Sequence, residues 1–112
     1  MNKVNFLLAS LVFSSSVYAT NNVKELEASC NDGFLNSCTD LGQMYEQGQF
    51  VKRDYSKASA LYSVACNNSY GEACNRLGLL YSAKGNRQKA TKYYRIGCSF
   101  NYELACTNLS RY

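Results

Sequence analysis

Six cysteines constrain this chain more than any other feature, because they fall into three pairs with identical spacing. The pairs are Cys30 and Cys38, Cys66 and Cys74, and Cys98 and Cys106, so the two members are always eight residues apart. The first members follow one another at intervals of 36 and then 32 residues. Such periods are typical of repeat proteins, in which one supersecondary unit is stacked several times. The sequence therefore predicts a repeat architecture with one cysteine pair per unit.

The residues around the cysteines repeat as well. A leucine follows the second cysteine of each pair at the same distance, at Leu41, Leu77 and Leu109. The segment 54–66 matches 86–98 at an offset of 32 residues. The difference between the two periods falls in polar stretches that carry a glycine, where loops tolerate insertions. We therefore expect ordered blocks separated by loops of unequal length.

The blocks have the apolar periodicity of helices. Asp54 and Asn86 precede two of them at N-cap positions, and Gly48 and Gly85 stand where the preceding helices should end. Gly42 and Gly78 recur inside a block, which suggests close helix approach. We expect an all-α chain with helices at about 22–31, 35–47, 54–67, 71–83, 87–100 and 102–111. Each repeat is then an antiparallel pair of an A helix and a B helix, and the chain begins with a lone B helix and ends with a lone A helix.

Each cysteine pair brackets the turn from a B helix to the following A helix. The midpoints of the pairs are Phe34, Tyr70 and Tyr102, which fall in these turns. Two positions equidistant from a helical turn face each other at disulfide distance. We therefore predict the disulfides Cys30–Cys38, Cys66–Cys74 and Cys98–Cys106. A spacing of eight residues and the absence of histidine argue against zinc, so we expect no metal and no cofactor.

The N-terminus has the pattern of a secretory signal peptide over residues 1–19. Lys3 precedes a short apolar run, and Ala19 ends a small-residue cleavage site. The run is too short to span a bilayer, which takes roughly 20 apolar residues, and we expect no membrane span. Processing would leave residues 20–112 as one domain, with repeats at about 30–65 and 66–101 flanked by half repeats. Signal and paired cysteines together predict a periplasmic or secreted protein.

The repeated motifs resemble a known family. The order Ala/Ser-Cys-x-x-Leu-Gly-x-x-Tyr, a glycine loop and then Asp-Tyr-Ser-Lys-Ala-x-x-Leu-Tyr is similar to the Sel-one-like repeat, a relative of the tetratricopeptide repeat. The cysteines eight apart resemble the helicobacter cysteine-rich proteins. The resemblance implies a right-handed α-α superhelix, a solenoid with one disulfide per repeat. It also implies a scaffold that binds proteins or peptides or, alternatively, a β-lactam-binding protein with weak β-lactamase activity.

The residues themselves give little support to an enzyme. Serine β-lactamases need Ser-x-x-Lys together with further serine and lysine motifs. After residue 19 the chain contains no Ser-x-x-Lys, no Ser-Asp-Asn and no Lys-Thr-Gly, and it has no histidine at all. Lys84 or Lys89 beside Ser82 or Ser56 would be the remaining combination. We therefore predict no catalytic residues, and β-lactamase remains the enzymatic alternative.

The expected binding surface is the outward stripe of the A helices, since stacked helix pairs expose one face of these helices in a groove. Ser37, Leu41 and Tyr45 are expected to face the core. The outward stripe then consists of Asn36, Asp40, Gln43, Glu72, Arg76, Leu79, Asn108 and Arg111. The candidate ligands are a protein or peptide, with cell-wall fragments or β-lactams as further possibilities. The alternative is an ordinary solvated helix face.

The net charge is too small to indicate a class of binding partner. The whole chain carries +4, and loss of Lys3 with the signal peptide would leave about +3. We expect no nucleic-acid partner. The basic series from Lys84 to Arg95 is most simply a solvated helix face, and the alternative is a weak preference for anionic envelope polymers. This series comprises Lys84, Arg87, Lys89, Lys92 and Arg95.

Overall fold

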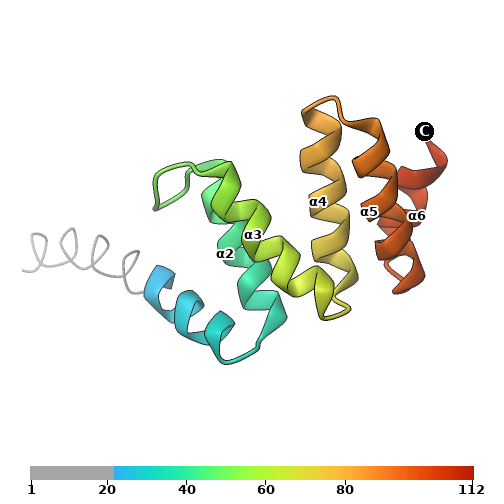
Figure 1. The fold of residues 1–112 in the computed structure, drawn as a ribbon. Coiled ribbons are helices and arrows are strands. Elements are labelled where there is room, and N and C mark those ends of the chain that lie inside the picture. Colours follow the sequence, from blue (N-terminus) through green and yellow to red (C-terminus); the bar gives the residue numbers. More distant parts are fainter. Residues whose placement is uncertain (1–21) are drawn as a thin grey trace, which may run out of the picture.

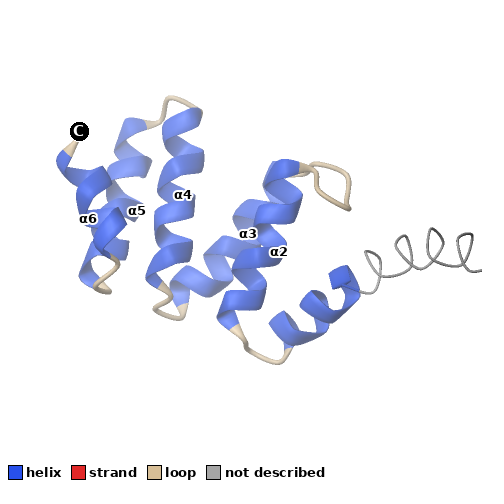
Figure 2. Cartoon of the chain, turned by 180° about the vertical axis from the view of Figure 1, so that it is seen from behind, coloured by secondary structure: helices blue, strands red, loops and turns tan. Residues whose placement is uncertain are grey.

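The computed structural model describes residues 22–112, and this part of the chain is helical throughout (Figure 1). A helix over 22–31 is followed by α2 (Leu35–Gln47), α3 (Tyr55–Asn67), α4 (Gly71–Ala83), α5 (Arg87–Ser99) and α6 (Glu103–Ser110). The six predicted helices are confirmed, with ends that differ by at most one residue. The predicted signal peptide lies outside the described residues. Short loops join successive helices, and no strand occurs between residues 22 and 112 (Figure 2).

The predicted caps explain where the helices begin and end. The Asp54 carboxylate accepts a hydrogen bond from the backbone N–H of Lys57 at 3.0 Å, and the Asn86 side chain accepts one from that of Lys89 at 3.1 Å. These bonds satisfy N–H groups that a helix leaves unpaired in its first turn. Gly48 closes α2 in the left-handed conformation, with φ of 68°. The residues at which the A-to-B loops begin and end are therefore determined by the local sequence.

The turns from a B helix to the next A helix share one geometry. The third residue after the first cysteine is left-handed in every turn, with φ of 95° at Gly33, 71° at Ser69 and 64° at Asn101. An aromatic residue follows each of them and occupies the N-cap of the A helix without a side-chain capping bond. The left-handed residue reverses the chain, so that the two flanking helices meet side by side.

The three predicted disulfides are confirmed. The Cα atoms of Cys30 and Cys38 lie 4.6 Å apart, those of Cys66 and Cys74 4.7 Å, and those of Cys98 and Cys106 4.6 Å. Every cysteine of the chain is paired in this way. Each bond joins the two helices on either side of one B-to-A turn. None of the three bonds connects helices that are further apart in the sequence.

The core lies between the helices of each pair. The rings of Tyr62 on α3 and Tyr94 on α5 are buried against α2 and α4, where Gly42 and Gly78 leave room for them. A Cβ atom added at Gly42 would lie 2.5 Å from Cε1 of Tyr62. The predicted packing role of these glycines is therefore confirmed. Pairs then stack through α3 on α4, and the A helices α4 and α6 also contact each other.

Candidate functional site

The predicted stripe forms a cluster of charged and polar side chains where α2 meets α4. Arg76 is its centre. Its Nη2 atom lies 3.3 Å from Oε1 of Glu72, one helical turn earlier on α4. With the amide oxygen of Gln43 turned toward Arg76, that oxygen accepts from Nη2 at 2.6 Å and from Nη1 at 2.9 Å. Residues of two A helices thus converge on one guanidinium, whose side chain is 26% exposed.

Two tyrosines fix the carboxylates beside this cluster. The hydroxyl of Tyr70 donates to Oε2 of Glu72 at 3.3 Å, and that of Tyr62 donates to Oε1 of Glu46 at 2.6 Å. Burial and the nearby Glu46 carboxylate raise the pKa of Tyr62 far above its ordinary value. The Tyr62 hydroxyl therefore stays protonated and remains a donor to Glu46.

Asp40 adds a second carboxylate to the same surface. Partial burial raises the pKa of Asp40, the negative charge of Glu72 raises it further, and Arg76 lowers it. Asp40 and Glu72 thus face one cation between them. Since one guanidinium offsets one of the two carboxylates, this end of the stripe retains a negative charge that a cationic ligand group can neutralise.

The remaining stripe residues lie around this cluster without joining its hydrogen bonds in the described part of the chain. Asn36 is exposed in the first turn of α2, and Arg111 is exposed at the end of α6. The Asn108 amide donates to Oδ1 of the buried Asn75 at 2.8 Å, which ties α6 to α4. Asn108 therefore has a packing role in addition to its place on the stripe.

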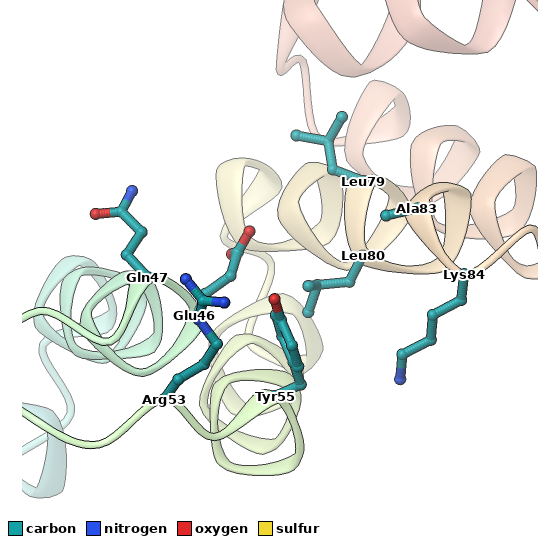
Figure 3. Close-up of a pocket in the computed structure, with 8 residues that line it drawn as sticks. All are labelled: Glu46, Gln47, Arg53, Tyr55, Leu79, Leu80, Ala83 and Lys84. Carbon is teal, nitrogen blue, oxygen red and sulfur yellow. The ribbon is translucent and has the colours of Figure 1, made fainter.

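A recess of about 470 Å³ opens at the end of the stripe, between the C-terminal turns of α2 and α4 and the start of α3 (Figure 3). Glu46 and Arg53 lie on one side and Lys84 on the other, with leucine and alanine side chains between them. Leu79 belongs both to the recess and to the predicted stripe, and it is 43% exposed. The lining residues are Glu46, Gln47, Arg53, Tyr55, Leu79, Leu80, Ala83 and Lys84.

Most of the recess was missed by the sequence analysis. Gln47 and Ala83 follow Gln43 and Leu79 by four residues, so extending the stripe by one helical turn would have found them. Arg53 comes from the longer A-to-B loop, for which no periodic signal exists. The repeat pattern predicts what the helices present, but it does not predict which side chains a loop of unequal length adds.

The recess lining offers few of the side chains that bind metals or act as nucleophiles. No group of three or more cysteine, aspartate or glutamate residues could hold a metal ion within residues 22–112. The lining of the recess includes no serine or cysteine. The hydroxyl of Ser82 instead shares a hydrogen bond with that of Tyr112. Between residues 22 and 112 no helix is long and apolar enough to cross a bilayer.

Comparison with known proteins places this geometry in a family. The model of the Sel1 repeat matches residues 35–70 and 71–99, and each match begins at the first residue of an A helix. The chain belongs to the Sel1-repeat family. Among solved structures it is similar to Helicobacter pylori cysteine rich protein B, with 33% identity and a TM-score of 0.72. The match covers 78% of this chain and 68% of that chain, whereas no curated protein sequence matches.

Membership of the Sel1-repeat family bears on two features of this chain, the stripe on the A helices and the disulfides. Sel1 repeats typically mediate protein interactions, and this chain presents its stripe on the A helices as such a scaffold would. Disulfides form and persist outside the reducing cytosol. Three disulfides in this chain, together with its similarity to a protein named as cysteine rich, indicate an extracytoplasmic protein.

Proposed function

We propose that the protein is a periplasmic or secreted scaffold that binds an extended peptide segment of a partner protein along α2 and α4. The observation that carries this proposal is the continuity of stripe and recess through Leu79. A peptide lying on the stripe would cross the Arg76 cluster and place one side chain in the recess. The volume of about 470 Å³ is in the range of sites that bury a ligand group.

The polar groups of the stripe are already held in place. Gln43 and Glu72 fix the Arg76 guanidinium, while Tyr62 and Tyr70 fix the neighbouring carboxylates. A ligand therefore does not have to order these side chains, which lowers the entropic cost of binding. This preorganisation favours recognition of a defined peptide over loose surface contact.

The charges of the two ends predict the polarity of the peptide. Asp40 and Glu72 leave the start of the groove negative, which favours a lysine or arginine of the ligand there. In the recess one carboxylate, Glu46, accepts from the Tyr62 hydroxyl and is outnumbered by two exposed cations, Arg53 and Lys84. The recess therefore favours an acidic group on an apolar stem, which would pack on Leu79 and Leu80.

Peptide selection tests this proposal. The oxidised protein is used to select binders from a displayed random peptide library, and the dissociation constants of the selected peptides are measured by titration calorimetry. We expect Leu79→Ser to weaken binding at least tenfold, because it removes an apolar wall of the recess. The matched control is Val64→Ser on the B helix α3, where the side chain is 49% exposed against 43% for Leu79.

Three results of this experiment would contradict the proposal: failure to select any binder, binders unaffected by Leu79→Ser, or equal losses in both variants. Selected sequences also test the polarity, because basic and acidic residues should be enriched at opposite ends. A uniform charge distribution in the selected peptides would refute that part of the argument.

β-Lactam binding is the second candidate function, and the recess is the feature that favours it. Arg53 and Lys84 could pair with the carboxylate of a penicillin while its apolar part packs on Leu80 and Ala83. Binding rather than hydrolysis is the expected activity, since no serine or cysteine lines the recess. Adding penicillin to the peptide titration decides this: competition supports the second candidate, and undiminished peptide binding removes it.

A further inference from the structure

The edge of the solenoid opposite the disulfides is strongly basic. This A–B edge consists of the two A-to-B loops and the first turns of α3 and α5, namely residues 48–57 and 84–89. Both loops lie at the upper ends of their helices in Figure 1, away from the disulfide-bridged turns. Six cations of this edge are exposed: Lys52, Arg53, Lys57, Lys84, Arg87 and Lys89.

Fewer carboxylates than cations lie at this edge. Glu46 lines the recess with Arg53 and Lys84, and Glu27 acts on Lys57 from the helix 22–31. Within residues 48–57 and 84–89 the single carboxylate is Asp54, which is engaged as the N-cap of α3. The opposite edge has the reverse sign, since Asp32, Glu72 and Glu103 lie in or just after the B-to-A turns. The two edges therefore differ in charge, which would orient the molecule in front of a negatively charged surface.

Aromatic rings support the cations of the A–B edge. Lys57 Nζ lies 4.8 Å from the ring centroid of Tyr45, and Lys89 Nζ lies 5.0 Å from that of Tyr81. Arg87 lies over the Tyr112 ring at 5.2 Å. Each of these contacts is a cation–π interaction that stabilises the position of the charge. The rings therefore help to hold the cations at the edge.

Phe50 is an exposed apolar side chain among these cations. Its side chain is 60% exposed in the longer A-to-B loop, and its backbone is left-handed with φ of 63°. The next residue, Val51, is half-buried, and the two cations Lys52 and Arg53 come after it. An aromatic side chain flanked by lysine and arginine is the combination with which peripheral proteins enter the interface of an anionic bilayer.

We propose that the A–B edge docks on a bilayer surface that contains anionic lipids. The phosphate groups of the lipids pair with the exposed cations, and Phe50 inserts between the headgroups. A soluble polyanion would use the cations but would gain nothing from an exposed phenylalanine, so the observations favour lipid. Arg53 and Lys84 belong to both surfaces, whereas Phe50 and Lys89 do not line the recess, so variants at Phe50 and Lys89 test the docking separately from the peptide groove.

The chain contains no tryptophan, so a single tryptophan can report insertion. Phe50→Trp is compared with Phe34→Trp, since Phe34 is equally exposed at 61% but lies in a B-to-A turn on the other edge. Both variants of the oxidised full chain are mixed with phosphatidylcholine vesicles with and without phosphatidylglycerol, an anionic lipid that gives the surface a negative potential. We expect a blue shift of the emission only for Phe50→Trp and only with phosphatidylglycerol.

A charge reversal on one helix provides the second arm. Lys89→Glu and Arg95→Glu change the net charge equally, and both residues are exposed on α5. We expect Lys89→Glu to weaken vesicle binding at least fivefold and Arg95→Glu to leave it nearly unchanged, because each cation at the surface contributes about fivefold. Salt at about 1 M should release the protein, since the Debye length is then only about 3 Å.

Several results would overturn the docking proposal. These are no blue shift of Phe50→Trp, the same shift in Phe34→Trp, or equal losses in the two charge variants. Dextran sulfate serves as the soluble polyanion probe. If it binds the protein through Lys89 while phosphatidylglycerol vesicles give no shift, the edge recognises polyanions in solution and the membrane proposal is wrong.

Discussion

At the scale of single residues, the turns show how one backbone conformation can be supplied by three different amino acids. Gly33, Ser69 and Asn101 occupy equivalent positions and are all left-handed. Glycine and asparagine accept this conformation readily, whereas serine does so at a cost. The cysteine spacing predicted the position of the turns correctly. It did not predict their shared conformation, because no single residue type marks the position.

At the left-handed turn position we expect substitutions to change stability in opposite directions, depending on whether glycine is removed or introduced. Gly33→Ala should lower the free energy of unfolding by roughly 1–2 kcal/mol, because a residue with a Cβ atom is disfavoured in the left-handed conformation. No atom lies within 4 Å of a Cβ atom at this position, so the cost is conformational and not steric. Ser69→Gly should be neutral or stabilising for the same reason. Urea unfolding of both variants measures the effect, and destabilisation by Ser69→Gly would contradict it.

At the scale of helices, the packing of α3 on α2 depends on one absent methyl group. The Tyr62 ring is fully buried and fills the space above Gly42, and Tyr94 repeats the arrangement over Gly78. The helices themselves were predictable because Asp54, Asn86 and Gly48 mark their ends. The recess was not, since Arg53 and Tyr55 reach it from a loop and a helix start that differ between the repeats.

Gly42→Ala tests this helix contact. In an exposed helix the change would stabilise by about 1 kcal/mol, because alanine is the better helix former. Here we expect a net loss of about 1–2 kcal/mol, since overpacking against a buried ring costs about 1–3 kcal/mol. Denaturant unfolding gives the sign directly.

The control for this prediction is a double-mutant cycle with Tyr62→Leu. Leucine is chosen because Leu26 stands at the position of the helix 22–31 that is equivalent to Tyr62. If the clash with Tyr62 is the cause, Gly42→Ala should be neutral or stabilising in the Tyr62→Leu background. An equal loss in both backgrounds would show that the ring is not responsible.

At the scale of the whole molecule, the fold is a row of units in which each helix contacts mainly its neighbours along the chain. Stability in such an array is a sum of local terms and neighbour interfaces, so the position of a lesion determines its effect. The repeat pattern was enough to predict this architecture. It could not predict the basic edge as a surface, because the cations of 48–57 and 84–89 are separated in sequence and meet only in the stack.

Removing disulfides at two positions tests this view. Each bond closes a loop of nine residues, for which chain entropy predicts about 2.5 kcal/mol. Cys66→Ala/Cys74→Ala should lower the melting temperature of the whole domain, since these residues lie in the core between α3 and α4. Cys98→Ala/Cys106→Ala should instead release mainly α6.

Amide hydrogen exchange followed by mass spectrometry distinguishes the two cases. The terminal variant should exchange faster at Glu103–Ser110 and change little in α2 and α3. The central variant should lose protection on both sides of its turn. Identical exchange maps for the two variants would show that the domain unfolds as one cooperative unit and would contradict the local description.

The eight-residue spacing also bears on how the chain acquires its bonds. Six cysteines allow 15 pairings, yet in this fold each bond joins two cysteines that are consecutive in the sequence. A polypeptide that emerges from its N-terminus into an oxidising solvent meets its correct partner first each time. Stepwise oxidation along the emerging chain would therefore form the native pairs in order.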